Sequence, residues 1–540
     1  MKLKIITILT FITGITFNGN AQLRFQKTID CTGNEFGNMF QSYNGNLSIV
    51  GTTDATAGNG NDILLMTTDL TGTASSNLYV GGLGTEFGTA MYIANTTGET
   101  TIVGRSNGFS TAPPNVQDVF AARLNSSGMP VFAKVFGTDS IDYVTTVKEA
   151  NDGGIIMAGR VKNNDRLDGL VIKMDATGTI QWSKNVGTPY ANEVIYDVKS
   201  LGTNTGYLVA GYSGVNTIGL NDATFSLLAN ADGAMQGTFV FGGAGDDDAR
   251  MIIDGAQGKF YIAGNTRSFG AGLGDIFLAR FDVSNFPPTL DWMKTYGGAG
   301  EDAFTSAVSN GNGGIVITGI TTSFGTGGDA LAFKVDTAGT LLWSKNYGGT
   351  SNDAFQSIIS DGGTGYTVLG YSNSYGANND VWIVNMDSTG STGCNESVAA
   401  LVSGTQAATY ITPPNMPTLD FTSNDIVLTD RVANFSPSSN VTSENALCTT
   451  VSVNDAVNSK TIAVYPNPSA DMVNINLGEN AADVKSISVY NYLGSKVFET
   501  ATDVNKSVYS VNVSNLAAGL YTLMVTTNHK PLTLKISVTK

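Results

Sequence analysis

The chain has 540 residues, of which 64 are glycine and only 14% are charged, and its formal net charge is −16. Residues 459–540 carry a net charge of +2, and residues 22–458 carry a net charge of −20. The acidic region 22–458 should repel nucleic acids and anionic lipid surfaces, so we expect no nucleic-acid partner. The only histidine, His529, lies near the C-terminus, which excludes histidine-dependent catalysis or zinc binding in the rest of the chain.

Residues 1–21 have the pattern of a secretory signal peptide. Lys2 and Lys4 supply a positive start, the apolar run IITILTFITGITF follows, and Gly19 and Ala21 are the small residues at its end. The run is shorter than the roughly 20 residues that a membrane-spanning helix needs. We therefore predict that this segment is cleaved on export and that no transmembrane span remains.

Residues 22–390 contain a repeat with steps of about 50–56 residues, which is near the period of four-stranded propeller blades. Three markers define it: an acidic residue at the first strand, a glycine in the second and an aspartate at the third. The markers are Glu35, Glu86, Asp142, Glu193, Asp248, Asp302 and Asp353; Gly51, Gly104, Gly159, Gly211, Gly264, Gly319 and Gly370; and Asp62, Asp118, Asp168, Asp222, Asp275, Asp329 and Asp380. Seven members in each series predict an all-β fold with a seven-bladed β-propeller.

The strand pattern also predicts how this propeller closes. No fourth strand follows Asp387, whereas residues 23–30 (LRFQKTID) have the pattern of a fourth strand placed before the first blade. The N-terminal segment should therefore supply the outer strand of the last blade. Such a closure removes an open sheet edge, which is a site of aggregation.

The repeated acidic residues have three alternative interpretations. They can accept backbone N–H bonds within turns, bind calcium through oxygen ligands, or form a catalytic pair that hydrolyses a glycoside. A catalytic pair belongs to one place and would not recur in every blade. Repetition therefore favours the turn role, and we expect no cofactor, with calcium as the alternative.

Loops that differ between blades are the better candidates for specificity, because binding residues concentrate in loops on a rigid scaffold. The longest connections between second and third strands are 105–117, 160–167 and 267–274, and 246–248 adds an acidic cluster on the same face. The candidate ligand-binding residues are Asp246, Asp247, Asp248, Arg105, Phe109, Arg160 and Arg267. The alternative is that the lengths of these loops drifted neutrally and have no role in specificity. The favoured function is binding or adhesion to a glycan or protein, and the rival is a carbohydrate-active hydrolase with paired carboxylates.

Residues 391–457 differ from the repeats because they are rich in Ser and Thr, contain Pro413, Pro414 and Pro417, and lack periodicity. We predict an irregular strap or linker. Disulfides persist outside the cytosol. We therefore expect a disulfide between Cys394 and Cys448, which bracket the strap, and we expect Cys31 to form none.

Residues 459–540 contain about seven short alternating runs, which predict a small Ig-like β-sandwich. The segments VYPNPSADMVNI, SVYNYLGSKVF, LAAGLYTLMV and KISVTK resemble the type A C-terminal sorting domain of the type IX secretion system. The residues that carry the match are Pro466, Asn467, Pro468, Gly494, Gly519, Tyr521, Lys535 and Lys540. The resemblance implies partners in the secretion machinery and its sorting peptidase, passage across the outer membrane, and release or surface attachment.

The repeats themselves are similar to the glycine-rich β-propeller repeats of secreted bacterial proteins. The segments GGAGDDDA, IAGNTRSFGAGLGDIFLARFD and TLLWSKNYGGTSNDAF carry this resemblance. It implies the fold and says little about biochemical function.

Overall fold

The structure is a computed structural model that describes residues 21–539, with short interruptions. The residues left out within that range are 32, 56–59, 83, 109–115, 139, 164, 203–204, 215–217, 256–257, 285–286, 310–313, 363–364, 412–421, 426–428, 433–442, 454–462, 477–483, 492–495, 502–505 and 528–531. The predicted signal peptide therefore lies almost wholly outside the described residues. The chain separates into two compact units, Leu23–Val451 and a smaller one that contains Ser452–Lys540.

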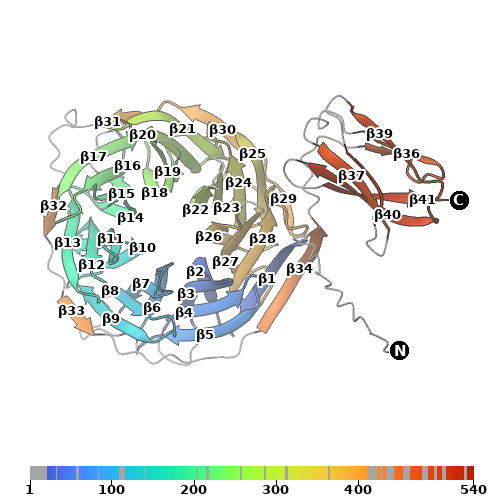
Figure 1. Cartoon of the computed structure of the whole chain (residues 1–540). Coiled ribbons are helices and arrows are strands. Elements are labelled where there is room, and N and C mark those ends of the chain that lie inside the picture. The colour runs from blue at the N-terminus through green and yellow to red at the C-terminus, as the bar shows by residue number, and fades with distance from the viewer. Residues whose placement is uncertain are drawn as a thin grey trace, which may run out of the picture. The chain divides into compact units, whose positions relative to one another are not determined.

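The larger unit is a ring of small antiparallel sheets, with β2, β6, β10, β14, β18, β22 and β26 nearest its centre (Figure 1). The first three sheets hold β2 (Glu35–Tyr43), β3 (Asn46–Thr53), β4 (Asp62–Asp69) and β5 (Ala74–Val80); β6 (Glu86–Ile93), β7 (Thr100–Ser106), β8 (Asp118–Leu124) and β9 (Pro130–Gly137); and β10 (Tyr143–Glu149), β11 (Ile155–Asn163), β12 (Arg166–Met174) and β13 (Ile180–Gly187).

The remaining sheets continue the same order around the ring. They hold β14 (Glu193–Ser200), β15 (Tyr207–Ser213), β16 (Asp222–Leu228) and β17 (Met235–Gly242); β18 (Asp247–Asp254), β19 (Lys259–Thr266), β20 (Asp275–Asp282) and β21 (Thr289–Gly297); β22 (Asp302–Ser309), β23 (Ile315–Thr321), β24 (Asp329–Val335) and β25 (Leu341–Tyr347); and β26 (Asp353–Ser360), β27 (Gly365–Ser372), β28 (Asp380–Asp387) and β1 (Ala21–Asp30).

The glycine marker of the second strand reflects a lack of space beside the first strand. A Cβ on Gly104 would lie 1.8 Å from the carbonyl oxygen of Phe87, and one on Gly211 would lie 1.8 Å from that of Val194. The register of the first strand shifts just beyond this contact, as between Gly88 and Ala90. Any larger residue would therefore separate the two innermost strands.

The turns between third and fourth strands follow the D-x-x-G pattern of the sequence. Asp336 Oδ1 accepts hydrogen bonds from the backbone N–H groups of Ala338 and Thr340, at 2.9 and 2.7 Å. Gly339 has a φ of +73° and donates its N–H to the Asp336 carbonyl. An aspartate acceptor and a left-handed glycine thus stabilise the turn together.

The N-terminal strand occupies the expected position in the last sheet. β1 pairs with β28 in antiparallel register from Phe25 opposite Asn385 to Ile29 opposite Val381. Phe25 and Ile29 are buried, so this strand contributes to the core as well as to the hydrogen bonding. Residues from the two ends of the ring-forming segment therefore meet in one sheet.

The predicted strap forms short strands outside the ring, shown in orange in Figure 1. They are β29 (Glu396–Val398), β30 (Val402–Gln406), β31 (Thr409–Ile411), β32 (Thr422–Asp425), β33 (Thr429–Val432) and β34 (Ser443–Val453). The first five pair in turn with β25, β21, β17, β13 and β9, so the strap follows the ring in the direction opposite to the sheets. β34 then joins β1.

The smaller unit consists of two antiparallel sheets. One holds β35 (Ala463–Tyr465), β36 (Met472–Asn476) and β39 (Val508–Asn512); the other holds β38 (Lys496–Ala501), β37 (Val484–Tyr490), β40 (Gly519–Thr527) and β41 (Leu532–Val538). Val473 and Val511 of the first sheet form one buried cluster with Ile487 and Leu523 of the second. Burial of alternate residues from both sheets is what gives this short segment its own core.

Candidate functional site

The acidic markers of the first strands serve as acceptors for backbone turns. Asp302 accepts hydrogen bonds from the N–H of Gly298 and the hydroxyl of Ser323, at 2.6 and 2.7 Å. Glu86 accepts in the same way from Gly82 and Ser106, both at 2.8 Å. Each acid thus ties the end of one sheet to the next.

The aspartates of the third strands face these acids from the neighbouring sheet. Asp275 Oδ2 accepts from the backbone N–H groups of Ala271 and Gly272, at 3.0 and 3.3 Å. Burial, and to a lesser extent Asp302, raises the pKa of Asp275. Asp275 and Asp302 are each only 1% exposed, so neither carboxylate is accessible to a polysaccharide. The turn role therefore accounts for this pair better than glycoside hydrolysis does.

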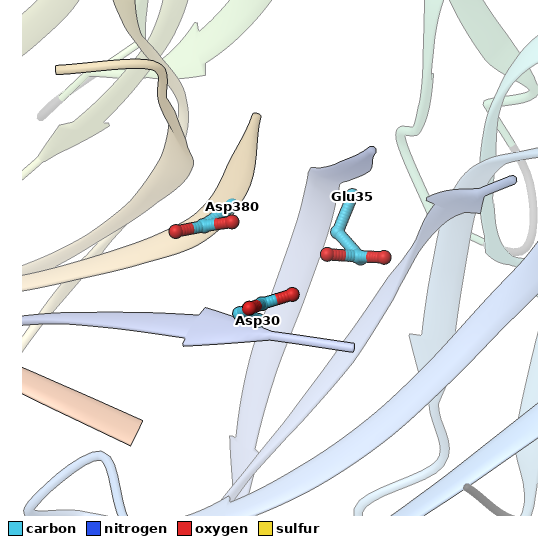
Figure 2. A group of neighbouring side chains, drawn as sticks. All are labelled: Asp30, Glu35 and Asp380. Carbon is cyan, nitrogen blue, oxygen red and sulfur yellow. The ribbon is translucent and has the colours of Figure 1, made fainter. Parts of the chain in front are cut away.

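Three carboxylates, those of Asp30, Glu35 and Asp380, lie near one another where the ring closes (Figure 2). One oxygen of each lies within 4.8 Å of the others. Glu35 already accepts hydrogen bonds from the N–H groups of Cys31 and Gly33, both at 3.1 Å. Burial raises the pKa of Glu35 to about 7, and burial together with Asp30 raises the pKa of Asp380 to about 6. The acceptor role of Glu35 is that of the same turn that recurs around the ring.

The fifth sheet corrects the register that the sequence suggested for the acidic series. β18 begins at Asp247, which is 1% exposed and accepts from the N–H of Gly243 and the hydroxyl of Ser268, at 2.8 and 2.6 Å. Asp247, rather than Asp248, is therefore the member of the series. Three consecutive aspartates, 246–248, made this register ambiguous in the sequence.

Two arginines from neighbouring sheets stack on one tyrosine ring. The guanidinium carbon of Arg160 lies 4.3 Å from the ring centroid of Tyr143, its partner across β10 and β11. The guanidinium carbon of Arg105 on β7 lies 5.4 Å from the same centroid and 4.2 Å from that of Phe87. All four side chains are partly exposed. Cation–π stacking in this geometry holds both guanidiniums against the inner strands.

The arrangement continues into the next two sheets. The ring centroids of Tyr196 and Tyr212 lie 6.1 Å apart, and the Arg250 guanidinium carbon lies 3.8 Å from that of Tyr196. Arg250 in turn donates from Nε and Nη2 to the two carboxylate oxygens of Asp248, at 2.7 and 2.8 Å. Burial raises the pKa of Tyr196 and of Tyr212, so both phenols stay neutral.

We call this group the arginine–tyrosine cluster. Its members come from the first and second strands of four successive sheets and form two contacting groups. The first is Arg105, Tyr143 and Arg160, and the second is Tyr196, Tyr212, Asp248 and Arg250. Three of these, Arg105, Arg160 and Asp248, are residues that the sequence singled out for ligand binding.

The other predicted ligand residues lie elsewhere. Asp246 accepts from the Asn221 side chain at 2.7 Å, and Arg267 pairs with Glu301 at 2.5 Å. Asp247 has the buried turn role given above, and Phe109 lies outside the described residues. The candidate site therefore draws on strand ends more than on the long loops.

Sequence reasoning missed Tyr143, Tyr196, Tyr212 and Arg250. A signal was present for Tyr212 alone, because the residue that follows the strand glycine of the repeat changes from one unit to the next. Those residues are Thr52, Arg105, Arg160, Tyr212, Asn265, Ile320 and Tyr371. Variation among repeats is expected of residues that face a ligand.

Of the cysteines, Cys31 is a free and fully buried thiol, and burial raises its pKa to about 12. The Cys394 carbonyl accepts from the side chain of Gln26 on β1, at 2.7 Å. β34, which contains Cys448, is hydrogen-bonded to the same strand. The side chain of Cys448 lies outside the described residues, so its pairing with Cys394 stays a prediction.

The predicted sorting motifs lie at the ends of the smaller unit's strands. Tyr521 is 8% exposed and donates its hydroxyl to the Ala517 carbonyl at 2.9 Å, while Asn467 Oδ1 accepts from the N–H of Ser537 at 2.7 Å. Gly494, Lys540 and the side chain of Lys535 lie outside the described residues.

Comparison with protein families decides the role of this unit. Residues 463–539 match the secretion system C-terminal sorting domain. The sorting domain directs export through type IX secretion to the cell surface or the extracellular space, and it implies interaction with the secretion machinery. In the described part of the chain, no helix is long and apolar enough to cross a membrane.

The ring has the arrangement of a β-propeller, and solved structures of low similarity were found. An α-L-arabinanase from Penicillium chrysogenum, complexed with arabinobiose, has 12% identity, covers 55% of this chain and 92% of its own, and has a TM-score of 0.35. The extracellular domain of a protein described as a hybrid two-component system from B. thetaiotaomicron has 10% identity, covers 95% and 76%, and has a TM-score of 0.21. Scores this low do not bear on function. No curated protein matches the chain.

Proposed function

We propose that this is a secreted or cell-surface binding protein whose propeller recognises an extracellular glycan or protein at the arginine–tyrosine cluster. The observation that carries the proposal is the stacking of Arg105 and Arg160 on Tyr143. All three side chains are partly exposed on strands of a closed ring, and none of the described carboxylates forms an ion pair with either arginine. A rigid scaffold with open donors and aromatic faces is suited to binding.

The scaffold, in this proposal, is a seven-bladed propeller closed by the N-terminal strand, followed by an Ig-like sorting domain. Three observations support this description: each of the seven repeats has a sheet with four strands of the ring, β1 pairs with β28, and two sheets pack together in residues 463–539. Closure matters for binding because it leaves no first or last blade free to separate, so the inner strands keep their spacing.

The rival function is a hydrolase with two carboxylates in the mouth of the propeller. The paired acids would have to reach the substrate, but Asp275 and Asp302 are 1% exposed, as are Asp247 and Asp353. Their oxygens already accept backbone N–H bonds, which also supports a turn role over calcium binding. The candidate site itself contains one carboxylate, Asp248, and that carboxylate is paired with Arg250.

The experiment is a binding screen of the secreted full-length protein against glycans and extracellular proteins, repeated with Arg105→Met and Arg160→Met. Methionine keeps much of the apolar stem and removes the guanidinium. Arg280→Met is the matched control, because Arg280 also stacks on an aromatic ring, Trp292, at 5.4 Å but lies outside the cluster. A ligand whose binding survives both cluster substitutions would contradict the proposed site. Turnover of a polysaccharide by the purified protein would instead favour the hydrolase.

A further inference from the structure

The arginine–tyrosine cluster is a positively charged region in an acidic protein. It contains three arginines and one aspartate, whereas residues 22–458 as a whole carry −20. A local excess of positive charge in such a surrounding attracts anions to one place and leaves the rest of the surface repulsive to them.

Arg250 shows how a carboxylate is bound in this environment. Two of its donor atoms, Nε and Nη2, meet the two oxygens of Asp248 in the parallel geometry that a guanidinium prefers for a carboxylate. Asp248 neutralises Arg250, so the remaining positive charge of the cluster resides on Arg105 and Arg160.

Arg105 and Arg160 have no equivalent of Asp248 among the described residues. The Nε atom of Arg160 is buried and has no hydrogen-bond partner in the described part of the chain. Burial, and the neighbouring charge of Arg160, lower the pKa of Arg105, although it remains fully protonated at neutral pH. A buried donor without an acceptor and two adjacent like charges are both relieved when an anion binds.

The surrounding rings add a second requirement for the ligand. Tyr143, Tyr196 and Tyr212 are partly exposed, and aromatic rings provide apolar faces with a polar tip. An inorganic anion would use the arginines alone. A sugar ring that carries an anionic group would use the arginines and cover the aromatic faces as well.

We infer that the cluster recognises an acidic glycan, with Arg105 and Arg160 binding the anionic groups and the tyrosines contacting the sugar rings. This inference rests on the proposed binding function and names its ligand class. The anionic group is a carboxylate or a sulfate, since the guanidinium fork matches the oxygens of either group.

Titration calorimetry on the full-length secreted protein tests the inference with three probes of similar length: oligogalacturonate, a heparin oligosaccharide and neutral maltohexaose. We expect binding of oligogalacturonate, heparin or both, with no binding of maltohexaose. The affinity should fall as salt rises from 50 to 200 mM, because the attraction is screened. Oligogalacturonate carries only carboxylates, whereas heparin carries both carboxylates and sulfates. Binding of heparin without binding of oligogalacturonate would therefore identify a sulfate as the preferred group.

Arg105→Met and Arg160→Met should each weaken binding about 30-fold or more, because each removes one partner of a charge-assisted contact. Arg160→Lys should also weaken it, since lysine keeps the charge and loses the planar fork. Arg280→Met should leave it unchanged, and melting curves should show that all variants remain folded.

Two results would overturn the inference. Equal affinity for maltohexaose and the acidic probes, lost in the same arginine variants, would leave the proposed binding site in place and remove its preference for anions. Binding of acidic glycans that both methionine variants retain would place the anion elsewhere on the protein.

Discussion

Asp248 and Arg250 form a bidentate ion pair, with nitrogen–oxygen distances of 2.7 and 2.8 Å, on the same strand that places the preceding Asp247 in a buried turn. The two side chains are 21% and 35% exposed, so water screens the pair only in part. Asp247 thus accepts a backbone hydrogen bond in a turn, whereas the next residue, Asp248, neutralises an arginine at the candidate site.

This pair can be measured by a double-mutant cycle of Asp248→Asn and Arg250→Met in urea denaturation. We expect each single substitution to lower the free energy of unfolding by about 1–2 kcal/mol, the usual contribution of a hydrogen bond to a charged group. The double variant should lose less than the two single losses added together. Additive losses would show that the two side chains do not interact in solution.

Ring closure predicts a stability defect on removal of the N-terminal strand. Compared with a chain that begins at residue 22, one that lacks 22–30 should aggregate or melt at a sharply lower temperature, because the edge of β28 becomes open and Phe25 and Ile29 leave the core. Size-exclusion chromatography and thermal melting check this. An unchanged melting curve with a monomeric profile would disprove closure by β1.

The raised pKa of Glu35 predicts how the stability of the folded protein depends on pH. Its pKa is raised from an ordinary 4.5 to about 7, so the folded state holds a proton that the unfolded state releases. Its contribution is therefore fully present below pH 4.5 and is lost as the pH rises through 7. Glu35→Gln should flatten the fall in melting temperature between pH 5 and 8. Parallel curves for the two proteins would show that Glu35 does not titrate in this range.

The predicted Cys394–Cys448 disulfide would close a loop of about 55 residues and contribute on the order of 4 kcal/mol in the chain-entropy model. Peptide mapping of the non-reduced secreted protein should recover the two cysteines in one crosslinked fragment. Cys31 should be labelled by an alkylating reagent only after unfolding, since it is fully buried. A crosslink that contains Cys31 would show that the pairing is wrong.

The sorting domain predicts a defect in export rather than in folding. A chain without 459–540 should keep a folded propeller and accumulate in the periplasm, because the two units have separate cores. Fractionation with immunoblotting measures its location, and protease resistance reports folding. Normal amounts of the truncated protein outside the cell would contradict the role of this domain in sorting.

The sequence by itself determined the repeat, the strand that completes the last sheet, and the identity of the sorting domain. These features are local or periodic: Gly104 recurs because its strand has no room for a Cβ, and Asp336 recurs because a short turn needs an acceptor. The period also placed residues 23–30 in the last sheet. Each of the other units has four strands, and the last repeat lacks its fourth strand after Asp387.

Only the tertiary structure decided which side chains form the candidate site and where the strap runs. Arg105 and Arg160 are 55 positions apart in the sequence and meet on Tyr143 because adjacent sheets pack face to face around the ring. The strap lacks periodicity because each of its strands needs only a backbone edge with which to pair, as β30 pairs with β21. The contact of Arg105 with Tyr143 depends on the spacing between sheets, and the path of the strap depends on which strand edges are open. No local pattern of residues encodes either of them.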